Sequence, residues 1–332
     1  MINAGKKRSM GKCAVVTGGT GAIGNALVRL LPKDGYRVYV LCRSGSVRRR
    51  FLSEAAGVHV IERDILDLAP EEEIVTEQCA MFFHLGWHAS YGAERLDPYG
   101  QVRNIQASLD AVHLAARLGC RVFVGAGSQS QYGPTDAVLT EDTPMRPDTA
   151  YGAAKLCAEQ MTRLLCRKLG LRHVWGRVCS VYGPCDGPYT LITYLMRASL
   201  RDEDALLTPC GQLWDFLFAD DAARAFIAMA EKGVDGRAYC VASGQARPLR
   251  EYIAAFERLP GYNAARIRIG GKPYAKKQRM RLSADISALT ADTGFAPAVS
   301  FEEGIARTWR WYCEHPEAAD VLCGKTGRIA EY

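Results

Sequence analysis

The residues best suited to chemistry are Tyr151 and Lys155. A spacing of four residues places both side chains on one face of a helix. An ammonium ion beside a phenol stabilises the phenolate and lowers the pKa of the tyrosine. Such a phenol can donate a proton to a carbonyl oxygen while hydride arrives, or take the proton back in the reverse reaction. Because this spacing also arises by chance, its meaning depends on the rest of the chain.

A glycine-rich turn upstream supplies that context. An apolar stretch at 13–17 ends in the turn 18–21, and a helical pattern of apolar residues follows. Strand, tight turn and helix form the start of a dinucleotide-binding unit, in which glycines let the backbone approach a pyrophosphate at the helix N-terminus. We therefore expect cofactor contacts from Thr17, Gly18, Thr20, Gly21, Ala22, Ile23 and Gly24.

The residues after the second expected strand, 37–42, favour NADP(H), with NAD(H) as the alternative. NAD-binding units carry an acid near this point for the ribose hydroxyls, but here Cys42 is followed by Arg43. An arginine attracts a 2′-phosphate, and Arg48 could reach the same group. The alternative is that Arg43 only points into solvent. Asp64, followed by Ile65, could accept a hydrogen bond from adenine or cap the next helix.

A serine-containing segment follows the fifth expected strand, 121–125. Active sites of open α/β sheets lie beyond the carboxyl ends of the strands. Ser128 and Ser130 could each bond a reacting oxygen there, or each could serve only the turn. The hydroxyl that assists Tyr151 is therefore expected in this segment.

The order of the elements predicts the fold. Strand-like stretches at 13–17, 37–42, 58–61, 81–85, 121–125 and 173–178 alternate with helical patterns that include 102–118 and 151–169. This alternation predicts an α/β Rossmann fold with a doubly wound parallel sheet. After Pro184 the strands become short, which predicts a smaller C-terminal lobe. We expect a flexible tail at 1–11, an NAD(P)-binding lobe at 12–184 with returns near 213–243, and a mainly substrate-binding lobe at 185–325.

Composition limits the other classes of function. The chain has 332 residues, of which 48% are hydrophobic and 23% charged, as in ordinary soluble proteins. Its net charge of +6 suits an anionic substrate, and its basic runs fit a solvated surface better than a nucleic-acid site. The 12 cysteines are scattered without metal-ligand spacing. We expect reduced cysteines, no metal, no signal peptide, no membrane span and a cytoplasmic protein.

Several motifs together resemble a known family. They are Thr17-Gly18-x-x-Gly21-x-x-Gly24, Asp64, Ser128 to Gly133, Tyr151-x-x-x-Lys155 and the segments 177–184 and 214–221. Over about residues 12–313 the chain resembles the extended short-chain dehydrogenases/reductases of the nucleotide-sugar epimerase/dehydratase/4-ketoreductase group. The resemblance implies NAD(P), a nucleotide-sugar substrate, and a homodimer formed through the helices near 102–118 and 151–169. It makes Ser128, Tyr151 and Lys155 catalytic, with Lys155 also holding the nicotinamide ribose.

The resemblance also assigns residues that line the two ligands. Ser180 stands where many members carry an asparagine for the substrate diphosphate, and Trp214 replaces an arginine that grips it. Arg279 or Arg281 could supply this charge instead. Trp87, Gln129 and Tyr194 could face the substrate or pack between the lobes. At the cofactor, the resemblance adds Leu85, Gly86, Val178 and Ser180.

The resemblance and the residues together predict a reaction. Family dehydratases carry Asp-Glu beside the catalytic hydroxyl residue, and here Gln129-Ser130 stands in that place, which argues against dehydration. With Arg43, the prediction is an NADPH-dependent reductase of a nucleoside-diphosphate 4-keto (6-deoxy) sugar. The alternatives are a nucleotide-sugar epimerase without net redox, a reductase of a non-nucleotide carbonyl compound, and a cofactor-sensing or RNA-binding protein.

Overall fold

The structure is a computed structural model that describes residues 12–69, 74–75 and 77–322. The expected tail at 1–11, and residues 323–325 of the expected C-terminal lobe, lie outside the described residues.

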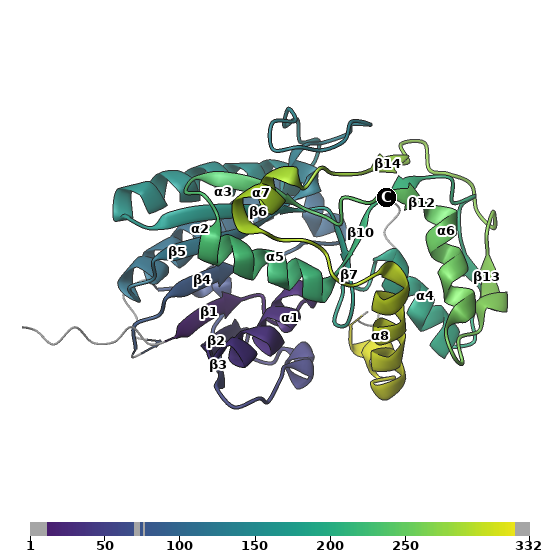
Figure 1. Ribbon diagram of the computed structural model, residues 1–332, viewed down its shortest axis with the longest axis horizontal. Coiled ribbons are helices and arrows are strands. Elements are labelled where there is room, and N and C mark those ends of the chain that lie inside the picture. Colours follow the sequence, from purple (N-terminus) through teal and green to yellow (C-terminus); the bar gives the residue numbers. More distant parts are fainter. Residues whose placement is uncertain (1–11, 70–73, 76, 323–332) are drawn as a thin grey trace, which may run out of the picture.

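A seven-stranded sheet forms the centre of the larger part of the molecule (Figure 1). All its pairings are parallel, in the order β11-β6-β5-β4-β1-β2-β3. The predicted α/β Rossmann fold with a doubly wound parallel sheet is confirmed. The strands are β1 (Cys13–Thr17), β2 (Arg37–Cys42), β3 (Val58–Glu62), β4 (Met81–His84), β5 (Val122–Ser128), β6 (Arg172–Val178) and β11 (Arg237–Val241).

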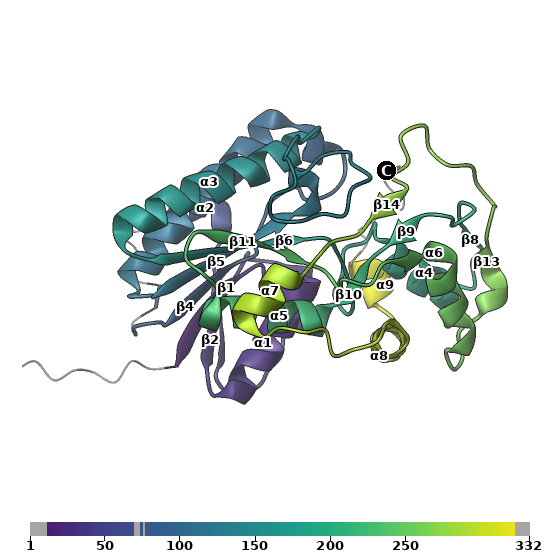
Figure 2. The same ribbon diagram turned by 45° about the horizontal axis from the view of Figure 1, so that its top comes forward.

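Helices cover both faces of this sheet (Figure 2). α1 (Ala22–Leu30) and α5 (Ala219–Lys232) lie on one face, and α2 (Pro98–Arg117) and α3 (Ala150–Leu169) on the other. α2 begins four residues before the prediction, because the Asp97 side chain accepts hydrogen bonds from the N–H groups of Tyr99 and Gly100. This cap fixes where the segment after β4 ends and the helix starts.

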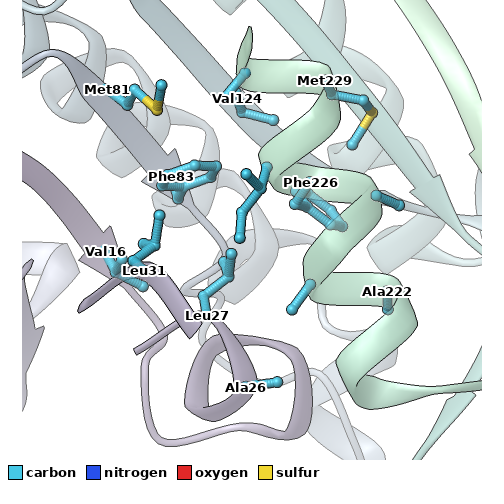
Figure 3. Close-up of a cluster of buried hydrophobic side chains, with 14 of the residues drawn as sticks. Val16, Ala26, Leu27, Leu31, Met81, Phe83, Val124, Ala222, Phe226 and Met229 are labelled. Carbon is cyan, nitrogen blue, oxygen red and sulfur yellow. The ribbon is translucent and has the colours of Figure 1, made fainter. Parts of the chain in front are cut away.

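Alternate residues of the central strands pack against opposite helix layers. Val16 of β1 and Phe83 of β4 join the cluster under α1 and α5, where Figure 3 shows them facing Leu27 and Phe226. Their neighbours Val15 and Phe82 point into the cluster under α2 and α3. Fully burying each such side chain contributes about 1.5–3 kcal/mol. The sheet is thus held from both sides, which fixes the carboxyl ends of its strands.

Much of the chain after β6, apart from α5 and β11, builds a second body beyond the end of the sheet (Figure 1). Its helices share a separate apolar cluster, and β7 pairs with β10 beside it. The predicted domain boundaries are not tested by this arrangement and stay a prediction. The elements are β7 (Ser180–Tyr182), α4 (Leu191–Leu200), β8 (Ala205–Leu206), β9 (Leu213–Trp214), β10 (Phe216–Phe218), β12 (Arg247–Pro248), α6 (Leu249–Ala254), β13 (Ile267–Arg268), β14 (Arg281–Leu282), α8 (Phe301–Glu314) and α9 (Ala318–Val321). α7 (Ser287–Thr293) instead packs against α5 and β11, in the cluster on the α1 and α5 face of the sheet.

Short 3-10 helices make many of the turns. Four of them matter for the site: η2 (Val47–Phe51), η3 (Ile65–Asp67), η4 (Ala93–Leu96) and η5 (Gln129–Gln131). The other three are η1 (Leu31–Asp34), η6 (Ala255–Arg258) and η7 (Ala264–Arg266).

One expectation about the cysteines is wrong. Cys13 of β1 and Cys79, two residues before β4, form a disulfide with their Cα atoms 4.5 Å apart. The two residues lie at the start of neighbouring parallel strands, a placement that their separation of 66 residues does not reveal. The other nine cysteines in the described part of the chain are free.

Candidate active site

The glycine-rich turn after β1 is packed backbone against backbone. Gly18 has a φ of 72°, and a Cβ there would overlap the backbone of Leu85 and Gly86. A Cβ on Gly24 would overlap the carbonyl oxygen of Gly18. By contrast, a Cβ on Gly21, the N-cap of α1, would meet only one protein atom within 4 Å. The start of α1 therefore leaves room on one side, where a pyrophosphate can approach its N–H groups.

A buried hydrogen-bonded chain holds Gly86 beside this turn. The Thr17 Oγ1 accepts from the Gly86 N–H at 3.0 Å and lies 3.1 Å from His84 Nδ1. His84 Nε2 lies 3.2 Å from the hydroxyl of Ser108, which donates to the carbonyl of Asn104. Burial lowers the pKa of His84 to about 3, so its ring is neutral. Thr17 thus positions the backbone rather than presenting its side chain on a surface.

A pocket of about 700 Å³ opens at the carboxyl ends of β2 and β3. Arg43, Arg48 and Arg63 line it together with Glu62 and Asp64. Here the structure brings together the residues that sequence reasoning assigned to the adenosine half of the cofactor.

Two of the three acids that line this pocket, Glu62 and Asp64, are already engaged. Glu62 pairs with Arg49 and accepts a hydrogen bond from the hydroxyl of Ser44. Asp64 Oδ1 accepts from the Leu66 N–H at 3.0 Å and so caps η3, the second of the two roles considered for it. Arg48 donates to the carbonyl of Leu322, while no side-chain partner engages Arg43 within the described ranges.

The three predicted catalytic residues lie near the carboxyl end of β5. Ser128 ends β5, and its Oγ accepts from the Ser130 N–H at 3.2 Å. Tyr151 and Lys155 occupy the first turns of α3, whose Gly152 packs against the carbonyl of Ser130. The arrangement brings the serine turn and the tyrosine helix into contact.

Lys155 is deeply buried, with 3% of its surface exposed. Its Nζ donates to the carbonyl of Ala126 at 2.6 Å and lies 3.8 Å from the ring centroid of Trp87. It is 5.9 Å from the ring centroid of Tyr151. Burial lowers the pKa of Lys155 to about 7. Trp87, predicted to face the substrate, therefore covers the ammonium group of the lysine.

Sequence reasoning missed a second cation at Tyr151. The guanidinium of Arg95, on η4, lies 4.2 Å from the centre of the Tyr151 ring. Its Nη2 donates to the Ser130 hydroxyl at 2.6 Å and its Nη1 to the carbonyl of Ser90. No spacing in the sequence connects residue 95 with residue 151, so only the fold reveals this contact.

A buried ion pair supports the serine turn from behind. Arg177 of β6 and Glu159 of α3 approach to 2.7 Å, and both are almost fully buried. Gln131 donates to the same carboxylate through Nε2 and accepts from the Ser128 N–H through Oε1. The backbone of Ser128 is thus tied to α3 and β6, another connection that the sequence did not predict.

Ser180 and Trp214, the two departures from the family pattern, contact each other. Trp214 Nε1 donates to the Ser180 Oγ at 3.0 Å. Arg279 donates to the carbonyl of Gly133 through Nη2, while its buried Nη1 finds no partner within the described ranges. Arg281 instead bonds Ser283. Of the predicted cationic residues, Arg279 is therefore the one joined to the segment that contains the serine turn.

The remaining predicted residues divide between the site and its supports. Gln129 lies next to Ser128, and its buried Oε1 has no partner in the described part of the chain. Tyr194 accepts from the Leu206 N–H and packs in the cluster of the second body, in line with lobe packing. The others lie at element ends: Ala22 and Ile23 in the first turn of α1, Thr20 before it, Ile65 at the start of η3, Leu85 after β4 and Val178 at the end of β6.

The described residues offer neither a metal cluster nor a membrane-spanning helix. Across residues 12–69, 74–75 and 77–322, no three His, Cys, Asp or Glu side chains lie close enough together to hold a metal ion. Within the same residues, no helix combines the length and the apolar character that crossing a membrane requires.

The chain is similar to several known proteins. Residues 14–242 match the NAD dependent epimerase/dehydratase family. A UDP-N-acetyl-alpha-D-glucosaminuronate decarboxylase of Bacillus cytotoxicus is 25% identical, covering 92% of this chain and 99% of the relative. A dTDP-glucose 4,6-dehydratase of Streptomyces griseus is 26% identical, covering 91% of this chain and 94% of the relative. The solved structure of a Thermotoga maritima UDP-glucose 4-epimerase with UDP-glucose has a TM-score of 0.81 and 25% identity, covering 92% of this chain and all of that one.

Fold, glycine turn and similarity agree on the class of protein, a Rossmann-type enzyme that uses a nicotinamide dinucleotide. The chain belongs to the NAD dependent epimerase/dehydratase family, within its nucleotide-sugar group. The residues fit the cofactor, because the turn at Gly18 and Gly24 is closed to side chains while the side next to Gly21 is open.

Proposed function

We propose that this protein is an NADPH-dependent reductase of a nucleoside-diphosphate 4-keto (6-deoxy) sugar. The observation that carries the cofactor preference is the set of arginines around the pocket at β2 and β3. Glu62 and Asp64 are engaged by protein partners there, whereas Arg43 is exposed and without a side-chain partner in the described ranges. A guanidinium in this position suits a 2′-phosphate, which an acid at the end of β2 would repel.

The residues of the site divide the reaction between them. When bound, the reduced nicotinamide supplies hydride to the ketone carbon. Tyr151 donates a proton to the ketone oxygen, and the hydroxyl of Ser128 stabilises the charge that develops on that oxygen. Lys155 holds the nicotinamide ribose and favours the phenolate that remains. Gly21 and the first N–H groups of α1 receive the pyrophosphate.

The residues beside Ser128 argue against water elimination. Gln129 and Ser130 follow it, and neither offers the carboxyl group that would work as acid or base. Ser130 is moreover bonded to Arg95. Epimerisation is the second candidate, because Tyr151 can also accept a proton and a UDP-glucose 4-epimerase shares the fold. That reaction would consume no cofactor.

The exposed faces of α2 and α3 support the proposal of a homodimer. Tyr99 is 87% exposed and Val102 59% exposed on α2, while Leu164 of α3 is 59% exposed. Exposed large apolar side chains on these two helices fit an interaction surface. For the compartment we propose the cytoplasm, because nine of the eleven cysteines in the described part of the chain are free, with the buried Cys13–Cys79 disulfide as the exception.

The test follows the absorbance of the reduced nicotinamide with protein, NADPH or NADH, and a panel of nucleoside-diphosphate 4-keto sugars. The proposal expects one sugar to be reduced with one NADPH consumed per sugar, and slower reduction with NADH. A changed sugar without loss of reduced cofactor would establish the epimerase instead. No reaction with any sugar, despite NADPH binding, would overturn the nucleotide-sugar substrate.

A further inference from the structure

Arg95 connects three parts of the candidate site. Its guanidinium stacks over the ring of Tyr151, with 4.2 Å to the ring centre. Its N–H groups donate hydrogen bonds to the hydroxyl of Ser130 at 2.6 Å and to the carbonyl of Ser90 at 3.1 Å. Ser130 in turn donates its N–H to the Oγ of Ser128. One side chain therefore contacts the tyrosine and the turn that carries the serine.

The charges around Tyr151 make this contact significant. Within the described ranges Arg95 forms no ion pair with an acid, and Lys155 lies farther from the ring, at 5.9 Å. The ammonium group of Lys155 is covered by Trp87 and bonded to the carbonyl of Ala126. Trp87 itself meets Tyr151 edge-on with ring centres 6.0 Å apart. Arg95 from η4 thus brings a permanent positive charge to the ring and Lys155 from α3 a titratable one, while the loop after β4, the end of β5 and η5 contribute uncharged Trp87, Ser128 and Ser130.

We propose that Arg95 is a positioning residue for the proton transfer, holding the Tyr151 ring against the Ser128–Ser130 turn and stabilising the phenolate form of Tyr151. A guanidinium over an aromatic face is attracted by the ring, and the attraction grows when the ring becomes negative. The role complements that of Lys155, whose burial favours its neutral form when no ligand is bound. The proposal rests on the proposed function in that it takes Tyr151 as the proton donor.

The test measures the ionisation of Tyr151 directly. Tyrosinate absorbance is followed with pH, and the curve of Tyr151→Phe is subtracted to leave the signal of this residue. We expect a midpoint below the ordinary value of about 10, and an upward shift of about one unit in Arg95→Met. Arg95→Lys keeps the charge but loses the planar stacking, so its midpoint should fall between them. An identical midpoint in the wild type and in Arg95→Met would overturn the proposal.

A matched control comes from the far end of the sheet. Arg237 lies over Tyr239 at 5.5 Å at the start of β11 and pairs with Asp292, so Arg237→Met removes an arginine–tyrosine contact together with an ion pair, away from the site. It should leave the Tyr151 midpoint unchanged. If Arg95→Met does not fold by circular dichroism, Arg95→Lys carries the test, and a midpoint equal to that of the wild type then counts against the stacking role.

The titration needs neither substrate nor cofactor, so it separates this proposal from the proposed function. If the Tyr151 midpoint shifts in Arg95→Met but no keto sugar is reduced, the role of Arg95 is supported and the proposed reductase function is refuted. Once a substrate is found, the pH dependence of kcat/KM in Arg95→Met should shift in the same direction as the Tyr151 midpoint. If a sugar is reduced but Arg95→Met changes neither the pH profile nor the Tyr151 midpoint, the proposed role of Arg95 is refuted and the reductase function stands. A purely structural brace would lower stability without moving either quantity.

Discussion

The cofactor end and the reaction end of this site are built by different means. At the cofactor end, one continuous segment from β1 to α1 forms the turn, and its glycines are required by backbone contacts. At the reaction end, Tyr151 meets Arg95 and Trp87, and Arg95 in turn bonds Ser130 of the serine turn, so three other segments come together there. Backbone geometry within one segment leaves a pattern in the sequence, whereas side-chain contacts between distant segments exist only once the sheet has assembled.

The largest effect should follow the loss of the proton donor. Tyr151→Phe removes the hydroxyl but keeps the ring on which Arg95 stacks. We expect the rate of reduction to fall on the order of a hundredfold or more, with NADPH binding retained in a fluorescence titration. A rate in Tyr151→Phe comparable to that of the wild type would mean that another group donates the proton, and that the contacts around Tyr151 do not serve the reaction.

The difference between the two ends also explains what could be predicted. The strands and helices of the sheet follow from periodicity and turn residues, and β2 matches its predicted bounds at Arg37 and Cys42. The placement of Ser128 near Tyr151 follows from the rule that sites gather at carboxyl ends of strands. The cover of Trp87 over Lys155, the stacking of Arg95 and the pair Glu159–Arg177 depend on tertiary packing. No local pattern encodes them, and the Cys13–Cys79 disulfide escaped for the same reason.

The glycine turn allows a sharp test of the cofactor end. A Cβ in Gly24→Ala would overlap the carbonyl oxygen of Gly18 in a closed part of the turn, whereas Gly21→Ala meets only that oxygen at 3.7 Å. We expect Gly24→Ala to lose about 1–3 kcal/mol of stability, since a packed backbone must shift. Gly21→Ala should fold normally and bind dinucleotides more weakly.

Urea unfolding and cofactor titration of the two variants together measure this contrast. If both variants kept full stability and full cofactor affinity, the turn would not be the pyrophosphate site. Together, Gly24→Ala and Gly21→Ala show which of the two glycines is required for stability and which for cofactor binding.

A smaller and more selective effect is expected at the pocket of β2 and β3. Arg43→Ser should raise the KM for NADPH about tenfold, because a charge-assisted contact to the 2′-phosphate contributes about 1.5–3 kcal/mol and this exposed side chain should give the lower end of that range. The KM for NADH should stay unchanged. Arg50→Gln, an exposed change outside the pocket, is the control. Equal effects on both cofactors would mean that Arg43 does not discriminate between them.

Stability should also depend on pH at the reaction end. Burial places the pKa of Lys155 at about 7 against 10.5 in an unfolded chain, so unfolding takes up a proton between these values. The free energy of unfolding should therefore rise with pH across that window, by up to about 1.4 kcal/mol per unit relative to Lys155→Met, which lacks the group. Below pH 7 both states carry the proton, and the difference between the two proteins should become constant.

Denaturant unfolding of the cofactor-free protein, repeated across the window, measures this difference. Lys168→Met on the exposed face of α3 should run parallel to the wild type, because its ammonium group stays in water in both states. Parallel curves for Lys155→Met as well would mean that the ammonium group is solvated in the folded protein. Trp87 would then not cover it, and the reaction end would be as open as the start of α1.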